Sequence, residues 1–394
     1  MSVISFAKKT SNGLCHFRRA WANDKLPLRC LLALCLTCTT QLASAVPFGM
    51  FDARSMAMGG VGVASGTQYA VFNNPALLTS AAEIHEWFVL APTLSKQIGD
   101  PDNVKDNLAT FQQDTNSPSI NQSKVQADLD ALNGSHYSTS SNAALVVAIP
   151  SRILSGAAFF NVYEASTAQP VIGGDDLAAS PPTYNSTLAQ RGLRVAENGI
   201  SAAKVIEAES GWMRNMAVGF SAKFLLIDGY GYSEPLRTAD IDINHDNSKS
   251  GSQFDLDVGA LKEFGVWKVG LVAKNIIPGK FKYATSGDTF KLDPQVRAGF
   301  AYQSRRSVLE LDLDLTENKP IGVDLPSQNA ALGWEWQVWE WLALRAGYNQ
   351  NLTGNKAGYA AAGIGVGISS LQIDVAAFSG DEGKGASAQL GLQF

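Results

Sequence analysis

Apolar and polar side chains alternate along much of this chain with a period of two residues. Residues 308 to 316 read Val-Leu-Glu-Leu-Asp-Leu-Asp-Leu-Thr, which places leucines on one side and acids on the other. Successive side chains of a β-strand point to opposite faces of the sheet. The alternation therefore predicts strands with one apolar and one polar face, and it recurs around Phe254, Arg297, Arg345 and Asp374.

Fourteen such strands are predicted, which indicates an all-β fold. We expect them at residues 85–97, 141–149, 155–165, 190–207, 213–228, 252–263, 266–275, 294–304, 307–316, 328–338, 341–350, 357–368, 371–378 and 386–394. Short turns alternate with longer loops, the longest at 98–140, 166–189, 229–251 and 276–293. An even strand number with this asymmetry of connections is typical of bacterial outer-membrane barrels. The sequence thus predicts a transmembrane antiparallel β-barrel of about 14 strands, since a soluble sandwich has no reason to sort its loops this way.

The two ends of the strands carry signals of a membrane setting. The last strand ends on Phe394 and resembles the terminal strand that the barrel-assembly machinery of the outer membrane recognises. Aromatic residues gather near predicted strand ends, where they favour the headgroup zone. They are Trp267, Trp334, Trp336, Trp339 and Trp341 at one end, and Tyr230, Tyr232, Tyr283 and Tyr348 at the other. The alternative is core packing in a soluble β protein.

The N-terminus has the pattern of a secretory signal. Basic residues precede a short apolar core at 31–37, and Ala43-Ser44-Ala45 is a small-residue cleavage site. We expect cleavage after Ala45, which removes all four cysteines of the chain and places the mature protein in the outer membrane of a Gram-negative bacterium. No later run of roughly 18 apolar residues predicts a membrane helix. The formal net charge of −5 gives no support for nucleic-acid binding.

Residues 46–82 do not alternate, and we expect them to form a plug inside a barrel of residues 83–394. Small residues allow close backbone packing in a confined space, and Asn74-Pro75 predicts a turn that opens a short helix at 75–80. The candidate plug residues are Arg54, Met56, Met58, Gly59, Gly60, Asn73, Asn74 and Pro75.

At these residues the chain resembles a known family. The run from Ala53 to Gly62 followed by Asn74-Pro75-Ala76 looks like the N-terminal plug of FadL-like long-chain fatty-acid transporters. More closely, the mature chain resembles the outer-membrane family labelled "conjugal transfer protein TraF", in motifs that include Ala148-Ile149-Pro150, residues 255–260, 270–275 and 294–299, and Leu344-Arg345-Ala346-Gly347-Tyr348. The resemblance implies a plugged fourteen-stranded barrel that passes apolar molecules, and it assigns no ligand to particular residues here. The label resembles that of a soluble, thioredoxin-like protein, but a mature chain without cysteine has no dithiol chemistry.

Charged residues at inward-facing strand positions are the main functional clue. They are Asp255, Asp257, Arg297, Glu310, Asp312, Asp314, Arg345 and Asp374, with Lys223 and Lys268 as further counter-charges. Charge on the lipid face is costly, so these side chains are expected to face the lumen. They either brace the wall and hold the plug, or line a polar path around it.

Other chemistry is weakly supported. Residues 60–66 resemble a dinucleotide loop but lack its third glycine and a preceding strand. His85, His136 and His245 lack metal-ligand spacing, and Asp240, Asp242 and Asp246 do not follow an ordered calcium-loop pattern, so no metal or cofactor is expected. His136-Tyr137-Ser138, with Asn142, leaves an outer-membrane lipase as a remote alternative. Residues 101–133 suit one or two short amphipathic helices, which either merely fill space or cap the barrel mouth.

The sequence therefore predicts a non-enzymatic outer-membrane barrel for the passive uptake of small apolar molecules of fatty-acid or hydrocarbon type. The expected partners are outer-membrane lipid and lipopolysaccharide, the barrel-assembly machinery and an apolar ligand. The alternative is a scaffold or accessory of a conjugation or secretion apparatus.

Overall fold

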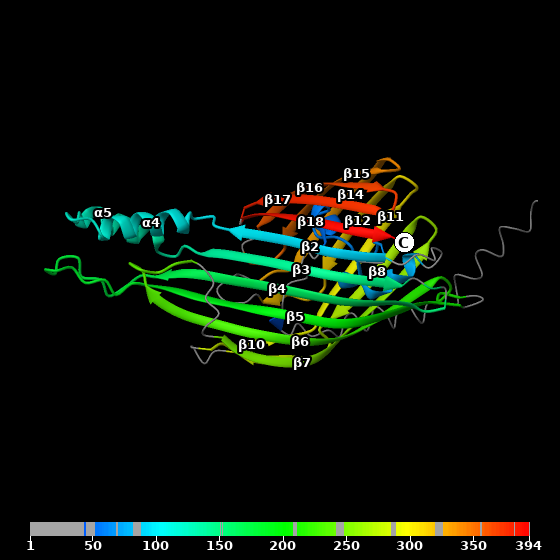
Figure 1. Cartoon of the computed structure of the whole chain (residues 1–394), viewed down its shortest axis with the longest axis horizontal. Helices are drawn as coiled ribbons and strands as arrows, with labels where there is room; N and C mark the ends of the chain where they lie inside the picture. The colour runs from blue at the N-terminus through cyan, green and yellow to red at the C-terminus, as the bar shows by residue number, and fades with distance from the viewer. Residues whose placement is uncertain are drawn as a thin grey trace, which may run out of the picture. The chain divides into compact units, whose positions relative to one another are not determined.

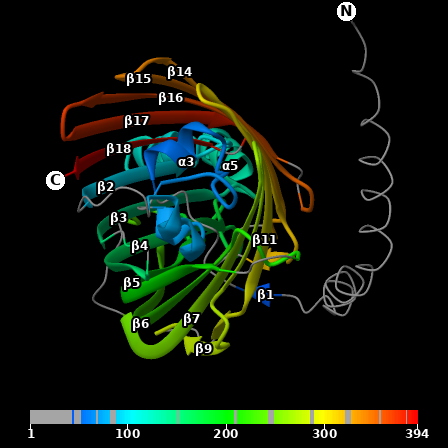
Figure 2. The same ribbon diagram turned by 90° about the vertical axis from the view of Figure 1, so that its right-hand side faces the viewer.

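The structure is a computed structural model of the chain. It describes residues 43–44, 52–67, 70–81, 88–149, 151, 153–207, 211–241, 248–284, 289–319, 326–354, 357–381 and 383–393. Fourteen antiparallel strands close into one barrel, in which the last strand, β18, pairs with the first barrel strand, β2 (Figures 1 and 2). The predicted fold class and the strand number are confirmed.

Each barrel strand matches one predicted strand. Their bounds are β2 Phe88–Gly99, β3 Tyr137–Ile149, β4 Ser155–Val171, β5 Thr187–Ile206, β6 Met216–Pro235, β7 Ser248–Phe264, β8 Trp267–Lys274, β11 Gln295–Gln303, β12 Ser307–Asp314, β14 Asn329–Trp339, β15 Leu342–Asn351, β16 Gly358–Ile368, β17 Leu371–Gly380 and β18 Gly383–Gln393. Short turns join the strands at one end, here called the short-turn end. The other end is called the long-loop end.

Three of the predicted loops are partly wrong. β4, β5 and β6 continue beyond the expected bounds and pair up to Val171–Thr187 and Thr187–Pro235, so the predicted loops 166–189 and 229–251 are shorter than expected. The predicted loop 276–293 contains a hairpin of β9 (Gly279–Lys282) and β10 (Thr289–Leu292). Its Phe281, Tyr283 and Phe290 pack on apolar residues of β5 and β6, and this tertiary contact has no local signal.

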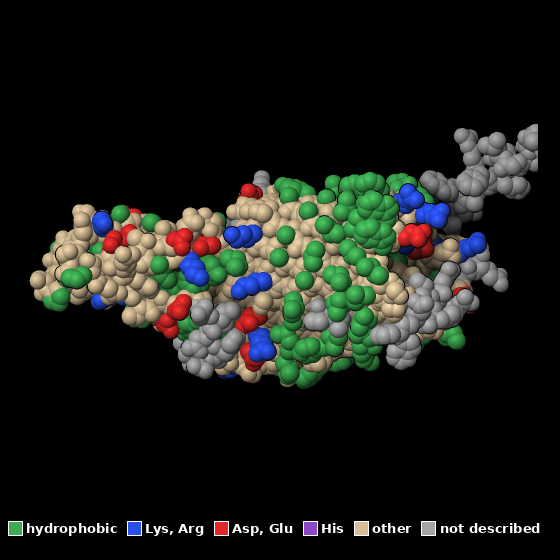
Figure 3. Space-filling model, turned by 45° about the horizontal axis from the view of Figure 1, so that its top comes forward, with side chains coloured by type: hydrophobic (Ala, Val, Ile, Leu, Met, Phe, Trp, Pro, Cys, Tyr) green, Lys and Arg blue, Asp and Glu red, His purple; other side chains and the backbone are tan. Residues whose placement is uncertain are grey.

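The wall has the predicted apolar outer face and polar inner face. On β12, Leu309, Leu311 and Leu313 are 46%, 50% and 39% exposed, whereas Glu310 and Asp312 are buried. Figure 3 shows hydrophobic side chains over the barrel wall, with charged side chains gathered toward its two ends. In the described part of the chain, no helix has the length and apolar character to cross a membrane.

The aromatic residues follow the prediction in part. Trp334, Trp336, Trp339 and Trp341 are exposed and form stacked pairs near the short-turn end, and Tyr348 is exposed on β15. The expectation is wrong for two tyrosines, since Tyr230 and Tyr283 are buried. The Tyr230 hydroxyl lies 3.5 Å from the Ala165 carbonyl oxygen, and the Tyr283 ring packs against Phe290.

The helices expected in 101–133 are present as α4 (Val104–Thr115) and α5 (Gln122–Leu132) at the long-loop end (Figure 1). The Asp100 carboxylate accepts a hydrogen bond from the Val104 amide at 2.6 Å, and the Asn121 side chain caps α5. Their apolar faces pack with Leu188 of β5 and with Leu236, which follows β6. The helices thus cover the extended ends of these strands.

The predicted signal segment lies outside the described residues, apart from β1 (Ala43–Ser44), which pairs in parallel with β13 (Asn318–Lys319). Phe394, His85, His245, Asp242 and Asp246 also lie outside them.

Candidate functional site

A segment that precedes the first barrel strand lies inside the lumen. We call its described residues, 52–67 and 70–81, the plug segment (Figure 2). It contains α3 (Ala53–Ala57) and the 3-10 helices η1 (Ala70–Phe72) and η2 (Pro75–Ala81). The Asp52 side chain caps α3 by accepting a hydrogen bond from the Ser55 amide at 2.6 Å. η2 begins at Pro75, as the sequence predicts.

Arg54 of α3 joins an ion-pair chain on the wall. Its Nε donates to Glu335 Oε2 at 2.9 Å, and Arg345 Nε donates to the same oxygen at 2.6 Å. Arg345 also pairs with Asp374 at 2.5 Å. Charges taken out of water need such partners and hydrogen bonds. Glu335 is absent from the predicted set, although the alternation Trp334-Glu335-Trp336 already places it on the inward face.

Two buried carboxylates on β12 bind the backbone of the plug segment. Glu310 Oε1 accepts hydrogen bonds from the amides of Ala64 at 2.6 Å and Ser65 at 3.0 Å. Asp312 Oδ2 accepts from the amides of Gly62 at 2.9 Å and Val63 at 3.1 Å. Buried backbone amides need such acceptors, because an unpaired buried N–H group is costly. These acids therefore fasten the chain that follows α3.

The other predicted charges divide into two groups. Arg297 pairs with Asp314 at 2.5 Å and donates from Nη1 to the Gly60 carbonyl oxygen at 3.2 Å, so it belongs with the plug segment. Asp257 instead pairs with Lys223 Nζ at 3.0 Å. Asp255 accepts a hydrogen bond from the Ile277 amide at 3.0 Å and so binds the chain that follows β8.

The remaining predicted plug residues make contacts within the plug segment or with the barrel wall. Asn73 Nδ2 donates to Asp52 Oδ2 at 3.0 Å. Asn74 Nδ2 donates to the carbonyl oxygens of Val63 at 2.8 Å and Ala260 at 3.2 Å. Met56 and Met58 are fully buried.

Seven glycines of the wall make room for the plug segment, each on a different strand from β6 to β16. They are Gly219, Gly259, Gly270, Gly299, Gly333, Gly347 and Gly363, here called the glycine ring. A Cβ atom at Gly333 would lie 2.6 Å from the Met58 carbonyl oxygen, and one at Gly363 would lie 2.5 Å from the Ala57 Cβ atom. A glycine within a strand often marks such a close approach of another backbone. The small residues of the segment itself are visible in the sequence, whereas no local signal links the wall glycines to them.

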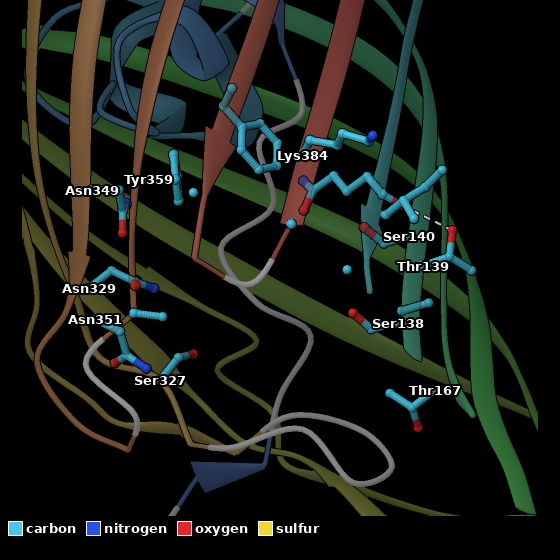
Figure 4. A pocket seen from close by; sticks show the side chains of 18 of the residues that line it. Ser138, Thr139, Ser140, Thr167, Ser327, Asn329, Asn349, Asn351, Tyr359 and Lys384 are labelled. Carbon is cyan, nitrogen blue, oxygen red and sulfur yellow. Dashed lines mark hydrogen bonds between the residues drawn. The ribbon is translucent and has the colours of Figure 1, made fainter. Parts of the chain in front are cut away.

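A cavity of about 270 Å³ lies between the plug segment and the long-loop end (Figure 4). Serine, threonine, asparagine and glutamine side chains supply much of its lining, with the rings of Tyr163, Tyr359 and Phe378. Asn349 Nδ2 and the Tyr359 hydroxyl both donate to the Gly59 carbonyl oxygen, at 2.9 and 3.1 Å. Two lining residues thus bind the plug segment, which closes the cavity on the side away from the long-loop end.

The residues of the lipase alternative do not assemble into a triad. His136 Nδ1 lies 3.7 Å from Asp102 Oδ2, and Ser138 lines the cavity. The Asn142 amide donates to Asn161 and to the Val162 carbonyl oxygen. Among the described residues, no group of three or more His, Cys, Asp or Glu side chains could hold a metal ion.

The closed wall, the apolar outer face and the internal segment define a plugged transmembrane-type β-barrel. The family described as "F plasmid transfer operon, TraF, protein" matches residues 71–314, more than half of the chain, and the chain belongs to this family. The search of the curated proteins finds no match.

Solved structures show the same fold. A TodX deltaS2S3 mutant, described as a monoaromatic hydrocarbon channel, is 12% identical with a TM-score of 0.53 over 87% of this chain and 98% of its own. The toluene transporter TodX of Pseudomonas putida is 13% identical with a TM-score of 0.50 over 87% and 98%. A FadL homologue of Pseudomonas aeruginosa is 13% identical over 89% and 99%, with a TM-score of 0.47. The chain thus shares the fold of TodX.

Proposed function

We propose that this protein lies in the outer membrane of a Gram-negative bacterium and takes up small, mainly apolar molecules passively. The cavity between the plug segment and the long-loop end carries the proposal, because it offers an entry site at that end and is closed on its other side by the plug segment. The fold shared with a hydrocarbon channel supports the same class of cargo. The chemistry of the site is binding and passage, and catalysis has no part in it.

The route past the plug segment opens at the turn around Gly59 and Gly60. The β12 carboxylates and most of the glycine ring hold the rest of the segment through many contacts that would have to break together, whereas Gly347 of the ring lies against Gly59. In the described structure, the carbonyl oxygens of Gly59 and Gly60 accept hydrogen bonds from the side chains of Asn349, Tyr359 and Arg297. A net hydrogen bond contributes about 0.5–1.5 kcal/mol, so these bonds can exchange one at a time. In this proposal the plug moves locally and stays in the barrel.

The membrane supplies the other partners. The exposed tryptophans near the short-turn end suit the headgroup zone. Lys96 of β2 is exposed near the long-loop end, where it suits the phosphates of lipopolysaccharide. We further propose that the barrel-assembly machinery inserts the chain through its terminal strand.

A cavity-blocking variant tests the uptake function. Ser140→Trp places a large ring in the cavity from β3, whereas Leu145→Trp on the same strand faces outward, where Leu145 is 39% exposed. In cells without another hydrocarbon channel, we expect Ser140→Trp to lower the rate of labelled toluene uptake at least several-fold and Leu145→Trp to leave it unchanged. Equal uptake by cells with and without the protein would refute the proposal.

A second function is favoured by one observation. The α4–α5 helices extend the barrel at the long-loop end and add a folded surface that a passive pore does not need (Figure 1). Together with the family description, this supports a scaffold or accessory role in a conjugation or secretion apparatus. Deletion of residues 104–132 would then abolish that role and leave uptake intact.

A further inference from the structure

The cavity has a lining of unusual character for an apolar cargo. Ser138 and Ser140 of β3 and Thr167 of β4 form one side, and Asn329, Asn351 and Ser327 form the opposite side (Figure 4). Among the described lining residues, Lys384 is the one that carries a charge. A purely apolar molecule would displace water from these groups without replacing its hydrogen bonds, and each such loss is costly. The lining therefore selects for neutral hydrogen-bonding groups on the ligand.

The same cavity offers flat apolar surface. The rings of Tyr359 and Phe378 lie 4.8 Å apart between centroids, and Tyr163 approaches from β4. Tyr163 also packs against the apolar cluster of Leu193, Val195 and Leu225 on β5 and β6. Aromatic side chains pack well against a ring in offset or edge-to-face geometry. A volume of about 270 Å³ admits one small ring compound but is too small for a long acyl chain in extended form.

We propose that the cavity binds a small neutral aromatic molecule that carries a hydroxyl group, a compound of the phenol or benzyl alcohol kind. The ring packs against Tyr163, Tyr359 and Phe378, and the hydroxyl group bonds to the serines of β3 or to the facing asparagines. This inference rests on the proposed function, because it names the class of molecule that the barrel would take up. Binding itself can be measured without transport.

Binding to the purified full chain tests the assignment. Phenol, toluene, glucose and hexanoate are titrated by calorimetry into the detergent-solubilised protein, and the heat measured with the Ser140→Trp variant is subtracted to remove partition into micelles. We expect saturable binding of phenol, with toluene, hexanoate and glucose each at least several-fold weaker. Toluene or hexanoate binding as tightly as phenol would overturn the proposal, and so would preferred binding of glucose, which would make the site a saccharide site.

A matched pair of variants tests the hydrogen bonds. Ser138→Ala combined with Ser140→Ala removes two inward hydroxyls, and Ser141→Ala removes an exposed hydroxyl of the same strand. A lost net hydrogen bond of about 0.5–1.5 kcal/mol corresponds to a roughly 2- to 12-fold weaker phenol affinity, with toluene unaffected. Unchanged phenol affinity in the double variant, or an equal loss in Ser141→Ala, would overturn the assignment.

The two proposals fail separately. Phenol binding without any protein-dependent uptake in cells would refute the uptake function and leave the ligand assignment standing. Protein-dependent uptake of toluene without preferred phenol binding would refute the ligand assignment and leave the uptake function standing.

Discussion

At the scale of single residues, the contact between the wall and the plug segment depends on the absence of side chains. Gly347 of β15 faces Met58 and Gly59, and a Cβ atom there would overlap the Met58 carbonyl group. Backbone cannot yield as the end of a flexible side chain can, so the wall or the plug segment would have to shift. The glycine ring therefore permits the close approach of the plug segment to the wall.

We predict that Gly347→Ala destabilises the protein by about 1–3 kcal/mol, the usual cost of overpacking a tight interior. Gly367→Ala on neighbouring β16 is the control, because a Cβ atom at Gly367 meets nothing within 4 Å. The thermal midpoint of unfolding in detergent should fall for the first variant and stay or rise slightly for the second. Equal midpoints for the two variants would show that the wall and the plug segment are not in close contact.

At the scale of elements, the strands were the most predictable part. The period of two in Leu309 to Leu315 arises because each strand separates an apolar outside from a polar inside. Every barrel strand must meet this requirement, so each carries the same pattern in its own sequence. The α4 and α5 helices were likewise visible in their apolar spacing. Such signals are local, and a single sequence is enough to detect them.

Features that depend on a distant partner could not be predicted. The β9–β10 hairpin forms because Phe281 and Phe290 find apolar residues on β5 and β6. The wall glycines matter only once the plug segment lies against them, and the cavity lining joins Ser140 to Asn349, far apart in the chain. The alternation predicted which charged residues face inward. Which of them bind the plug segment and which pair with Lys223 could be seen only in the closed barrel.

The α4–α5 pair should respond to pH. Burial raises the pKa of the Asp128 carboxyl above its usual value, and the charge of neighbouring Asp114 raises it further. Because the folded form holds the proton more tightly than the unfolded form, this stabilisation is complete below the unfolded pKa and is lost as pH rises through the folded pKa. Both helices should therefore be most stable in acid.

Hydrogen exchange of the α5 amides, corrected for the intrinsic rate, measures this effect. We expect protection to decrease as pH rises above about 4, the ordinary pKa of an aspartate. Asp114→Asn should raise protection at neutral pH and flatten the pH profile, whereas the Glu263→Gln control, at the short-turn end of β7, should change neither. Protection that rises with pH in the wild type would contradict the assignment.

At the scale of the whole molecule, the arrangement of long loops and short turns predicts which end faces outward. The long-loop end carries α4 and α5 (Figure 1). The exposed tryptophans lie near the short-turn end. In outer-membrane barrels the long loops are external and the short turns periplasmic. The cavity would then open to the outside and the plug segment would separate it from the periplasm.

Cysteine labelling tests this orientation, because all four native cysteines lie within the first 38 residues, in the segment predicted to be removed. Lys124→Cys on α5 and Arg306→Cys in a short turn are both exposed positions. A large maleimide reagent should label the first in intact cells and the second only after the outer membrane is opened. The reverse labelling pattern would show that the barrel has the opposite orientation in the membrane.

The glycine ring also constrains the order in which the molecule can be built. The segment that it holds stands at the start of the barrel sequence, but the seven positions are spread over strands from β6 to β16. The early segment therefore cannot reach its final place until most of the later chain has been synthesised and paired. The segment therefore docks late, and a docked plug segment indicates that the barrel wall is complete. In an unfinished barrel this segment would stay exposed to proteases, and quality control could recognise it.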